Sequence, residues 1–158
     1  MVEKKKDFSD KFFKNHLSRL LSVQYIYTWI FLNQRFSNKV SGFVFEPESL
    51  LELMLNDFTL GNRLKFNKNL YFDILSNFEY MVPLVNKKAS EIATERPIEE
   101  ICPVTRSIWY CIITEVDVLK HIPPLVAIDE AIELEKQLNA GEMYGLTNAF
   151  LGKYFGLS

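Results

Sequence analysis

Cysteine and histidine are scarce in this sequence, which narrows the chemistry that it can support. The chain holds two cysteines and two histidines among 158 residues. Cys102 and Cys111 lie in apolar surroundings without the spacing of metal ligands, so we interpret them as reduced thiols of an intracellular, cytoplasmic protein. A thiol in an apolar helix has a raised pKa and is inert, and neither His16 nor His121 is expected to activate a nucleophile. We therefore predict that the chain is not an enzyme.

Long apolar runs, alternating strands and glycine-rich loops are missing as well. The apolar clusters are too short to cross a membrane, and the charged start, residues 1–6, is not followed by the apolar region of a secretory signal. The only candidate for alternating polarity is residues 43–45, which we assign to a loop. The six glycines are scattered, so no phosphate cradle or dinucleotide site is predicted, and no cofactor is expected.

Apolar residues at helical spacing are abundant instead, and such residues make up 48% of the chain. Between Ser9 and Leu32 they recur every three or four positions, which predicts a long amphipathic helix capped by Ser9. Prolines and glycines divide the rest of the chain into further segments of helical period. The expected helices are residues 47–60, 64–80, a helix opened by Pro83, 104–118, a helix that follows Pro123 and ends at Gly141, and 143–155. The sequence thus predicts an all-α fold of about seven helices in a single domain, residues 1–158.

Three of these segments carry apolar stripes that predict the centre of the core. The stripe residues are Ile108, Ile112, Ile128, Ile132 and Leu151. We expect all of these side chains to be buried where the two halves of the fold meet.

Charge is unevenly distributed along the chain, although the formal net charge is only −2. Residues 1–20 carry six basic and three acidic side chains, a net charge of +3. Residues 97–142 carry nine acidic and three basic side chains, a net charge of −6. This asymmetry indicates one face for an anion and another for a different partner, although ordinary solvated faces would give the same pattern.

Three carboxylates stand close together on one predicted helix. Asp129, Glu130 and Glu133 share about one helical turn, but no histidine or further carboxylate follows at the spacing of a metal site. We predict no metal there, and a solvated acidic face in which one of the three caps or pairs locally.

The first helix carries the best candidates for nucleic-acid contact. Cations bind phosphates, and aromatic rings stack on unpaired bases. The candidates for RNA binding are Lys11, Lys14, Asn15, His16, Arg19, Gln24 and Tyr27. Phe12, Phe13 and Tyr27 could equally belong to the core.

Two stretches resemble the NusB family. Residues 18–29, SRLLSVQYIYTW, resemble the family's opening helix, in which an arginine precedes a Gln-x-x-Tyr pattern. Residues 97–151 resemble its C-terminal signature, with PPLVAIDEAIEL from Pro123 and TNAFL from Thr147. Residues 34–96 match in helical character only. The resemblance implies two three-helix bundles that share one core with a seventh helix.

The resemblance also implies a function. NusB proteins pair with the ribosomal protein NusE, and the pair binds boxA RNA, which helps RNA polymerase read through terminators, chiefly in ribosomal RNA operons. For this chain it implies transcription antitermination, with NusE, single-stranded boxA-like RNA and the RNA polymerase elongation complex as partners. No membrane is expected as a partner, and homodimer formation stays open, because some relatives self-associate.

Further site residues lie later in the chain. Tyr144 and Asn148 of the last predicted helix join the RNA-binding set for their own chemistry, because they offer stacking and base-edge contacts if the fold brings them near the first helix. The residues that the resemblance implies to bind the protein partner are Thr105, Arg106, Glu115 and Glu142.

The sequence departs from the family pattern at these surfaces. Residues 15–17, Asn-His-Leu, stand where the family has a run of arginines, and only Arg19 remains in place. Asp129, Gly145 and Ala149 replace an asparagine, a lysine and a glycine. Thr105 replaces an acidic residue. The scaffold tolerates these changes, whereas RNA affinity and boxA specificity do not follow from the resemblance.

Two rival hypotheses are therefore kept. The same helical module precedes the catalytic domain of some ribosomal RNA cytosine methyltransferases, but that enzyme needs a following cofactor-binding domain, which this chain is not expected to have. The other rival is a scaffold that binds a NusE-like protein and has weak or no RNA binding, and the missing arginine run is its main support.

Overall fold

The computed structural model describes residues 2–35, 65–92, 96–139 and 143–157. Its α-helices are α1 (Val2–Arg35), α3 (Lys68–Ile92), α4 (Pro103–Ile113), α5 (Pro124–Asn139) and α6 (Tyr144–Tyr154). A 3₁₀ turn covers Ile98–Glu100, and a π-helical turn covers Thr114–Val118. These described ranges contain no strand, which confirms the all-α prediction.

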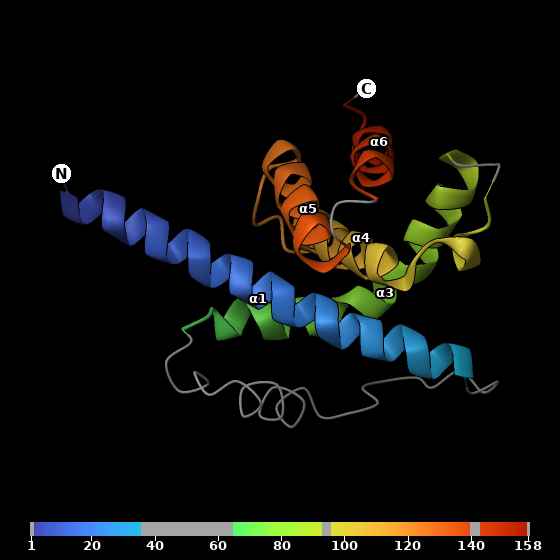
Figure 1. The fold of residues 1–158 in the computed structure, drawn as a ribbon, viewed down its shortest axis with the longest axis horizontal. Helices are drawn as coiled ribbons and strands as arrows, with labels where there is room; N and C mark the ends of the chain where they lie inside the picture. Colours follow the sequence, from blue (N-terminus) through green and yellow to red (C-terminus); the bar gives the residue numbers. More distant parts are fainter. Residues whose placement is uncertain (1, 36–64, 93–95, 140–142, 158) are drawn as a thin grey trace.

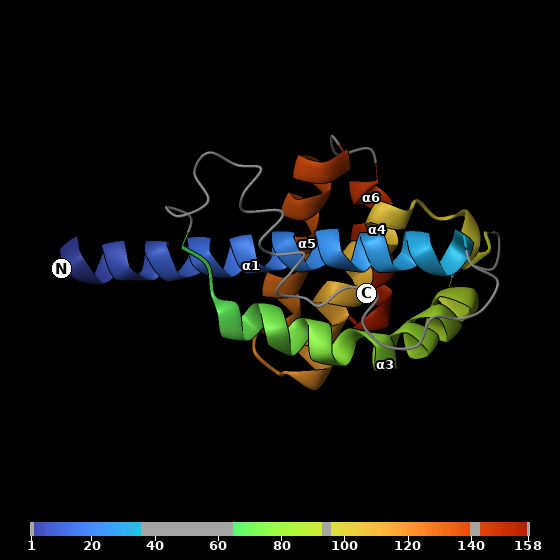
Figure 2. The ribbon, with the colours of Figure 1, turned by 90° about the horizontal axis from the view of Figure 1, so that it is seen from below.

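Helix α4 lies at the centre of the fold and packs against the other four helices. The long helix α1 crosses beneath α4 and α5, and its N-terminal part runs on past them (Figure 1). Helix α3 lies beside α1 when the molecule is seen from below (Figure 2). Helix α6 packs chiefly on α5. This arrangement leaves one side of the N-terminal half of α1 open beside α5.

The core is filled mainly by α4 and the faces turned toward it. Ile108 and Ile112 are fully buried, and Trp109 stacks on Phe150 with ring centroids 4.0 Å apart. Burial of such large apolar side chains is the main force that stabilises a helical domain. Four members of the predicted core stripe are buried, namely Ile108, Ile112, Ile128 and Leu151. The prediction was wrong for Ile132, which is only partly buried and packs at the edge of the core.

Two predicted helix boundaries were wrong, each for a different reason. Helix α1 begins at Val2 rather than at Ser9, because the lysines and glutamate of its first turns are good helix formers. Helix α3 continues through Pro83 instead of ending before it. Buried Met81 and Val85 lie on either side of the proline, so packing outweighs the lost hydrogen bond, and the helix bends (Figure 1).

The described residues hold six of the seven predicted helices, and one fewer α-helix than predicted is present in them. Five α-helices are present in the described residues, because residues 68–92 form one helix in place of two. The predicted helix over 47–60, the loop at 43–45 and the stop at Gly141 lie outside the described residues. The predicted helix over 104–118 is α4 followed by the π turn, after which Lys120 adopts a left-handed backbone with φ of 50°.

Candidate functional site

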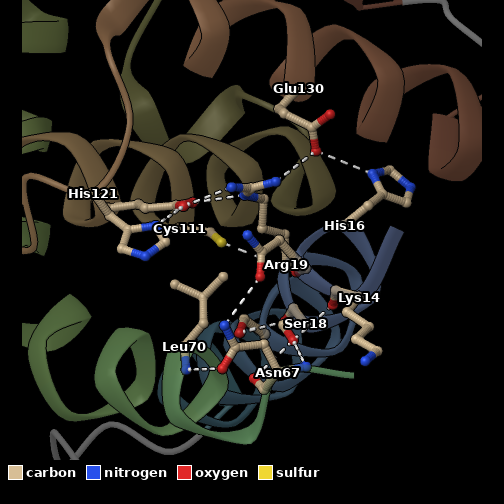
Figure 3. A network of polar contacts seen from close by, with 12 residues as sticks. Lys14, His16, Ser18, Arg19, Asn67, Leu70, Cys111, His121 and Glu130 are labelled. Carbon is tan, nitrogen blue, oxygen red and sulfur yellow. Dashed lines mark hydrogen bonds and ion pairs between the residues drawn. The ribbon is translucent and has the colours of Figure 1, made fainter. Parts of the chain in front are cut away.

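Several polar residues of the first helix, among them Asn15 and Ser18, face inward and join it to the rest of the fold. The backbone N–H of Asn67 donates to Ser18 Oγ at 2.7 Å, and the Asn67 side chain donates to Asn15 Oδ1 at 3.0 Å. Asn67 Oδ1 also accepts from the backbone N–H of Leu70 at 3.1 Å, so Asn67 caps α3. Figure 3 shows Ser18, Asn67 and Leu70 together at this junction. Asn15 is thus a link between α1 and α3.

Arg19 lies between two carboxylates in the interior. Its Nε and Nη2 donate to the two oxygens of Glu115, each at 2.7 Å, and its Nη1 donates to Glu130 Oε2 at 3.0 Å. All three side chains are at most 2% exposed. Burial on its own would lower the pKa of Arg19, but the hydrogen bonds and charges of the two glutamates raise it. This buried arrangement, which we call the arginine lock, joins α1, the π turn and α5.

Two histidines extend the arginine lock toward the surface. His16 Nδ1 lies 3.1 Å from Glu130 Oε2, and His16 Nε2 lies 2.7 Å from Gln137 Oε1. Both ring nitrogens face oxygen acceptors, an arrangement that the doubly protonated imidazolium satisfies. The more exposed His121 lies 3.4 Å from Glu115 Oε1. His16 and Glu130 point toward one another in Figure 3.

The contact between His16 and Glu130 shifts the pKa of both groups. The hydrogen bond to Glu130 raises the pKa of His16, while burial and the charge of Arg19 oppose the rise. Burial would raise the pKa of Glu130, but the hydrogen bond from His16 and the charge of Arg19 lower it overall. Both shifts favour the charged pair at neutral pH.

Cys111 lies against the arginine lock without any reactive character. Its thiol is fully buried and approaches the backbone oxygen of Arg19 at 3.9 Å. Burial raises the pKa of Cys111 far above its ordinary value, which confirms that it is a structural thiol.

The residues predicted to bind RNA fall into two groups. Lys11, Tyr27, Tyr144 and Asn148 are exposed, and Lys14 and Gln24 are partly exposed. Asn15 and Arg19 are buried, and His16 is held by Glu130 and Gln137. Tyr144 and Asn148 lie on α6, which packs on α5 rather than along α1. The structure therefore does not bring the predicted set together on one surface.

The residues implied to bind a protein partner are mostly internal. Thr105 and Glu115 are fully buried, and Arg106 is 6% exposed. Thr105 Oγ1 accepts a hydrogen bond from Asn139 at 3.2 Å, and Arg106 Nε donates to the backbone oxygen of Ile101 at 3.2 Å. Side chains held in this way do not face a partner in this conformation. Glu142 lies outside the described residues.

Sequence reasoning missed the internal role of the acidic residues. Glu130 was expected to lie on a solvated face, but it is buried and pairs with residues more than a hundred positions away. Glu135 is also buried, and Thr147 donates to it at 2.8 Å while accepting from Trp109 Nε1 at 2.9 Å. A signal was available, because Glu130 stands three and four positions from buried Ala127 and Leu134 on the same helical stripe.

Within the described ranges, no group of three or more histidine, cysteine, aspartate or glutamate side chains is placed to hold a metal ion. No described helix is both long and apolar enough to span a bilayer. The polar clusters in those ranges join helices to one another.

The fold is an all-helical domain held together by internal polar contacts, and comparison with known sequences identifies its family. Residues 16–155 match the sequence profile of the NusB family. The chain is 31% identical over 136 residues to the transcription antitermination protein NusB of Shewanella sp. (strain W3-18-1), and equally to that of Shewanella baltica (strain OS155). Each match covers 86% of this chain and 90% of the relative. The chain belongs to the NusB family, and because this family is not enzymatic, the prediction that it is no enzyme is confirmed.

Proposed function

We propose that the protein is a cytoplasmic transcription antitermination factor. In this proposal it forms one domain over residues 1–158 and acts with a NusE-like ribosomal protein on single-stranded, boxA-type RNA, chiefly of ribosomal RNA operons, to modify elongation by RNA polymerase. The observation that carries the proposal is the family match over residues 16–155, which extends over nearly the whole chain.

The electrostatics of α1 support RNA contact at two positions. Lys11 is exposed and Lys14 partly exposed, and the Lys14 amine points away from the arginine lock in Figure 3. Two lysines that face solvent can neutralise phosphates. Exposed Tyr27 and Tyr144 offer rings on which unpaired bases stack. Two phosphate contacts by themselves support only weak binding, so the proposal includes the partner protein.

One observation favours the scaffold alternative, in which protein binding is kept and RNA binding is weak or absent. Arg19 and His16, two of the basic groups available on α1, are held by internal carboxylates and present no free charge to a phosphate. The loss of these charges leaves the outward face of the helix with less of the positive potential that RNA binding needs.

A gel-shift titration with boxA RNA decides between the two functions. Labelled boxA RNA is titrated with this protein alone, with NusE alone and with both, and a scrambled RNA of equal length serves as the control. Antitermination predicts that the pair binds boxA tighter than either protein alone and tighter than the scrambled RNA. If the pair forms but binds both RNAs equally weakly, the scaffold alternative holds.

A further inference from the structure

A groove opens between the N-terminal half of α1 and the outer face of α5. It has a volume of about 490 Å³ and is lined by Phe12, Phe13 and Ile132 together with charged residues of α5. Phe12 is 47% exposed and Phe13 57% exposed. Two adjacent, half-exposed phenylalanines beside a partly buried isoleucine form an apolar surface that water covers poorly.

The rim of this groove is acidic. Asp129 and Glu133 are exposed on α5, and Glu133 lies 3.6 Å from the Lys136 amine. Glu130 also lines the groove, but its charge is met by Arg19 and His16. The lining thus carries more free negative than positive charge. Exposed carboxylates repel phosphates, so this surface is unfavourable for RNA.

We propose that the groove is a docking site for a basic, amphipathic helical segment of another protein. Large apolar side chains at helical spacing would insert between Phe13 and Ile132, while flanking lysines or arginines would pair with Asp129 and Glu133. This is the way in which an amphipathic helix binds a hydrophobic groove. A volume of about 490 Å³ accommodates a few such side chains.

The proposed docking site is separate from the lysines that the proposed function uses. Phe12 and Phe13 line the α5 side of the helix. Lys14 follows Phe13 by one position, about 100° around the helix, and does not line the groove. The docking site can therefore be tested without changing the proposed RNA contacts.

The test uses a fluorescent 18-residue peptide of leucine and lysine at helical spacing, with a leucine and glutamate peptide of the same pattern as its control. Binding to the full chain is followed by fluorescence anisotropy. We expect the basic peptide to bind and the acidic peptide not to bind. The charge reversal Asp129→Lys with Glu133→Lys, and separately Phe12→Ser with Phe13→Ser, should each weaken binding at least about tenfold, because aromatic anchors and desolvated charges dominate such interfaces.

Matched variants outside the groove control for non-specific attraction. Tyr80→Ser removes an aromatic ring that is 75% exposed on α3, and Glu99→Lys with Glu100→Lys reverses two exposed acidic residues. These variants should bind the basic peptide as the parent does. Equal loss in groove and control variants, equal binding of the acidic peptide, or no binding of the basic peptide would overturn the proposal. Single-stranded RNA gives a further outcome. If it displaces the peptide and also shifts the amide resonances of Asp129 and Glu133, the groove is assigned to RNA instead.

Discussion

Arg19 and Glu115 form a two-point contact across 96 positions of sequence, with both nitrogen–oxygen distances at 2.7 Å. The planar guanidinium matches the two carboxylate oxygens, a geometry that lysine does not reproduce. Glu115 belongs to the π turn at the end of α4, so the contact fixes α1 to the centre of the fold. Arg19, a candidate for RNA binding in the sequence analysis, thus lies in the interior.

Removal of Arg19 should destabilise the protein strongly. Arg19→Ala would leave Glu115 and Glu130 buried without the arginine that lies between them, which costs about 3–5 kcal/mol in the free energy of unfolding. Chemical denaturation measures the effect. Lys11→Ala, an exposed substitution on the same helix, is the matched control and should change stability by less than about 0.5 kcal/mol. An equal midpoint for the two variants would mean that the arginine lock does not form in solution.

His16 should make stability depend on pH. Its pKa is raised by Glu130, so the stabilisation from protonated His16 is complete below the unfolded value of about 6.5 and is lost as pH rises through the folded value. The stability advantage of the parent over His16→Gln should therefore shrink from pH 6 to pH 9. The groups that face His16 are Glu130, Gln137 and Arg19, and the first of these is already ionised over this range because its pKa is lowered.

The control for this measurement is His121→Gln, which removes the exposed histidine near Glu115. NMR titration of the His16 ring gives its pKa directly. A constant difference between parent and His16→Gln across the pH range, or a His16 pKa at or below its ordinary value, would contradict the assigned contact.

Two isoleucines test how far the core extends. Ile108 is fully buried on α4, so Ile108→Ala should cost about 2–5 kcal/mol through lost transfer energy and a cavity. Ile132 is partly buried beside the groove, where water can fill the space, and Ile132→Ala should cost clearly less. Denaturation midpoints of the two variants check the order, and a larger loss at Ile132 would place it in the core after all.

The fold could be predicted from the sequence where one rule acted alone. The spacing of apolar residues every three or four positions predicted a helix wherever the structure describes one, because the apolar stripes are long. The prediction failed at Pro83, where the local rule against proline competed with the packing of Met81 and Val85 on both sides of it. Local rules do not weigh such tertiary contacts.

The site was less predictable, because it depends on distant pairs. Arg19 stands on the buried stripe with Val23 and Ile26, which shows that it faces inward, but nothing local identifies Glu115 and Glu130 as its partners. The contact between His16 and Glu130 joins residues 114 positions apart. Lys11 and Tyr27 are exposed, although the helical spacing had left Tyr27 open as a core residue, and both remain predictions as RNA contacts.

The last prediction concerns these exposed lysines. If RNA runs along α1, the variant Lys11→Ala with Lys14→Ala removes two phosphate contacts. Each contact to single-stranded RNA contributes about 0.7 to the slope of log affinity against log salt, so the double variant with NusE should bind boxA RNA more weakly and with a slope about 1.4 shallower. Fluorescence anisotropy over a series of salt concentrations measures both quantities, and size-exclusion chromatography should show that binding to NusE itself is retained.

The matched control for the lysine pair is Lys87→Ala with Lys153→Ala. These exposed lysines lie near the C-terminal ends of α3 and α6, on other helices than Lys11 and Lys14, and the double substitution removes the same total charge. A protein that attracts RNA only through its overall charge would lose equal affinity in both double variants. A slope that falls only in the Lys11 and Lys14 variant places RNA on α1. An unchanged slope in that variant favours the scaffold function, because Lys11 and Lys14 would then contact no phosphate.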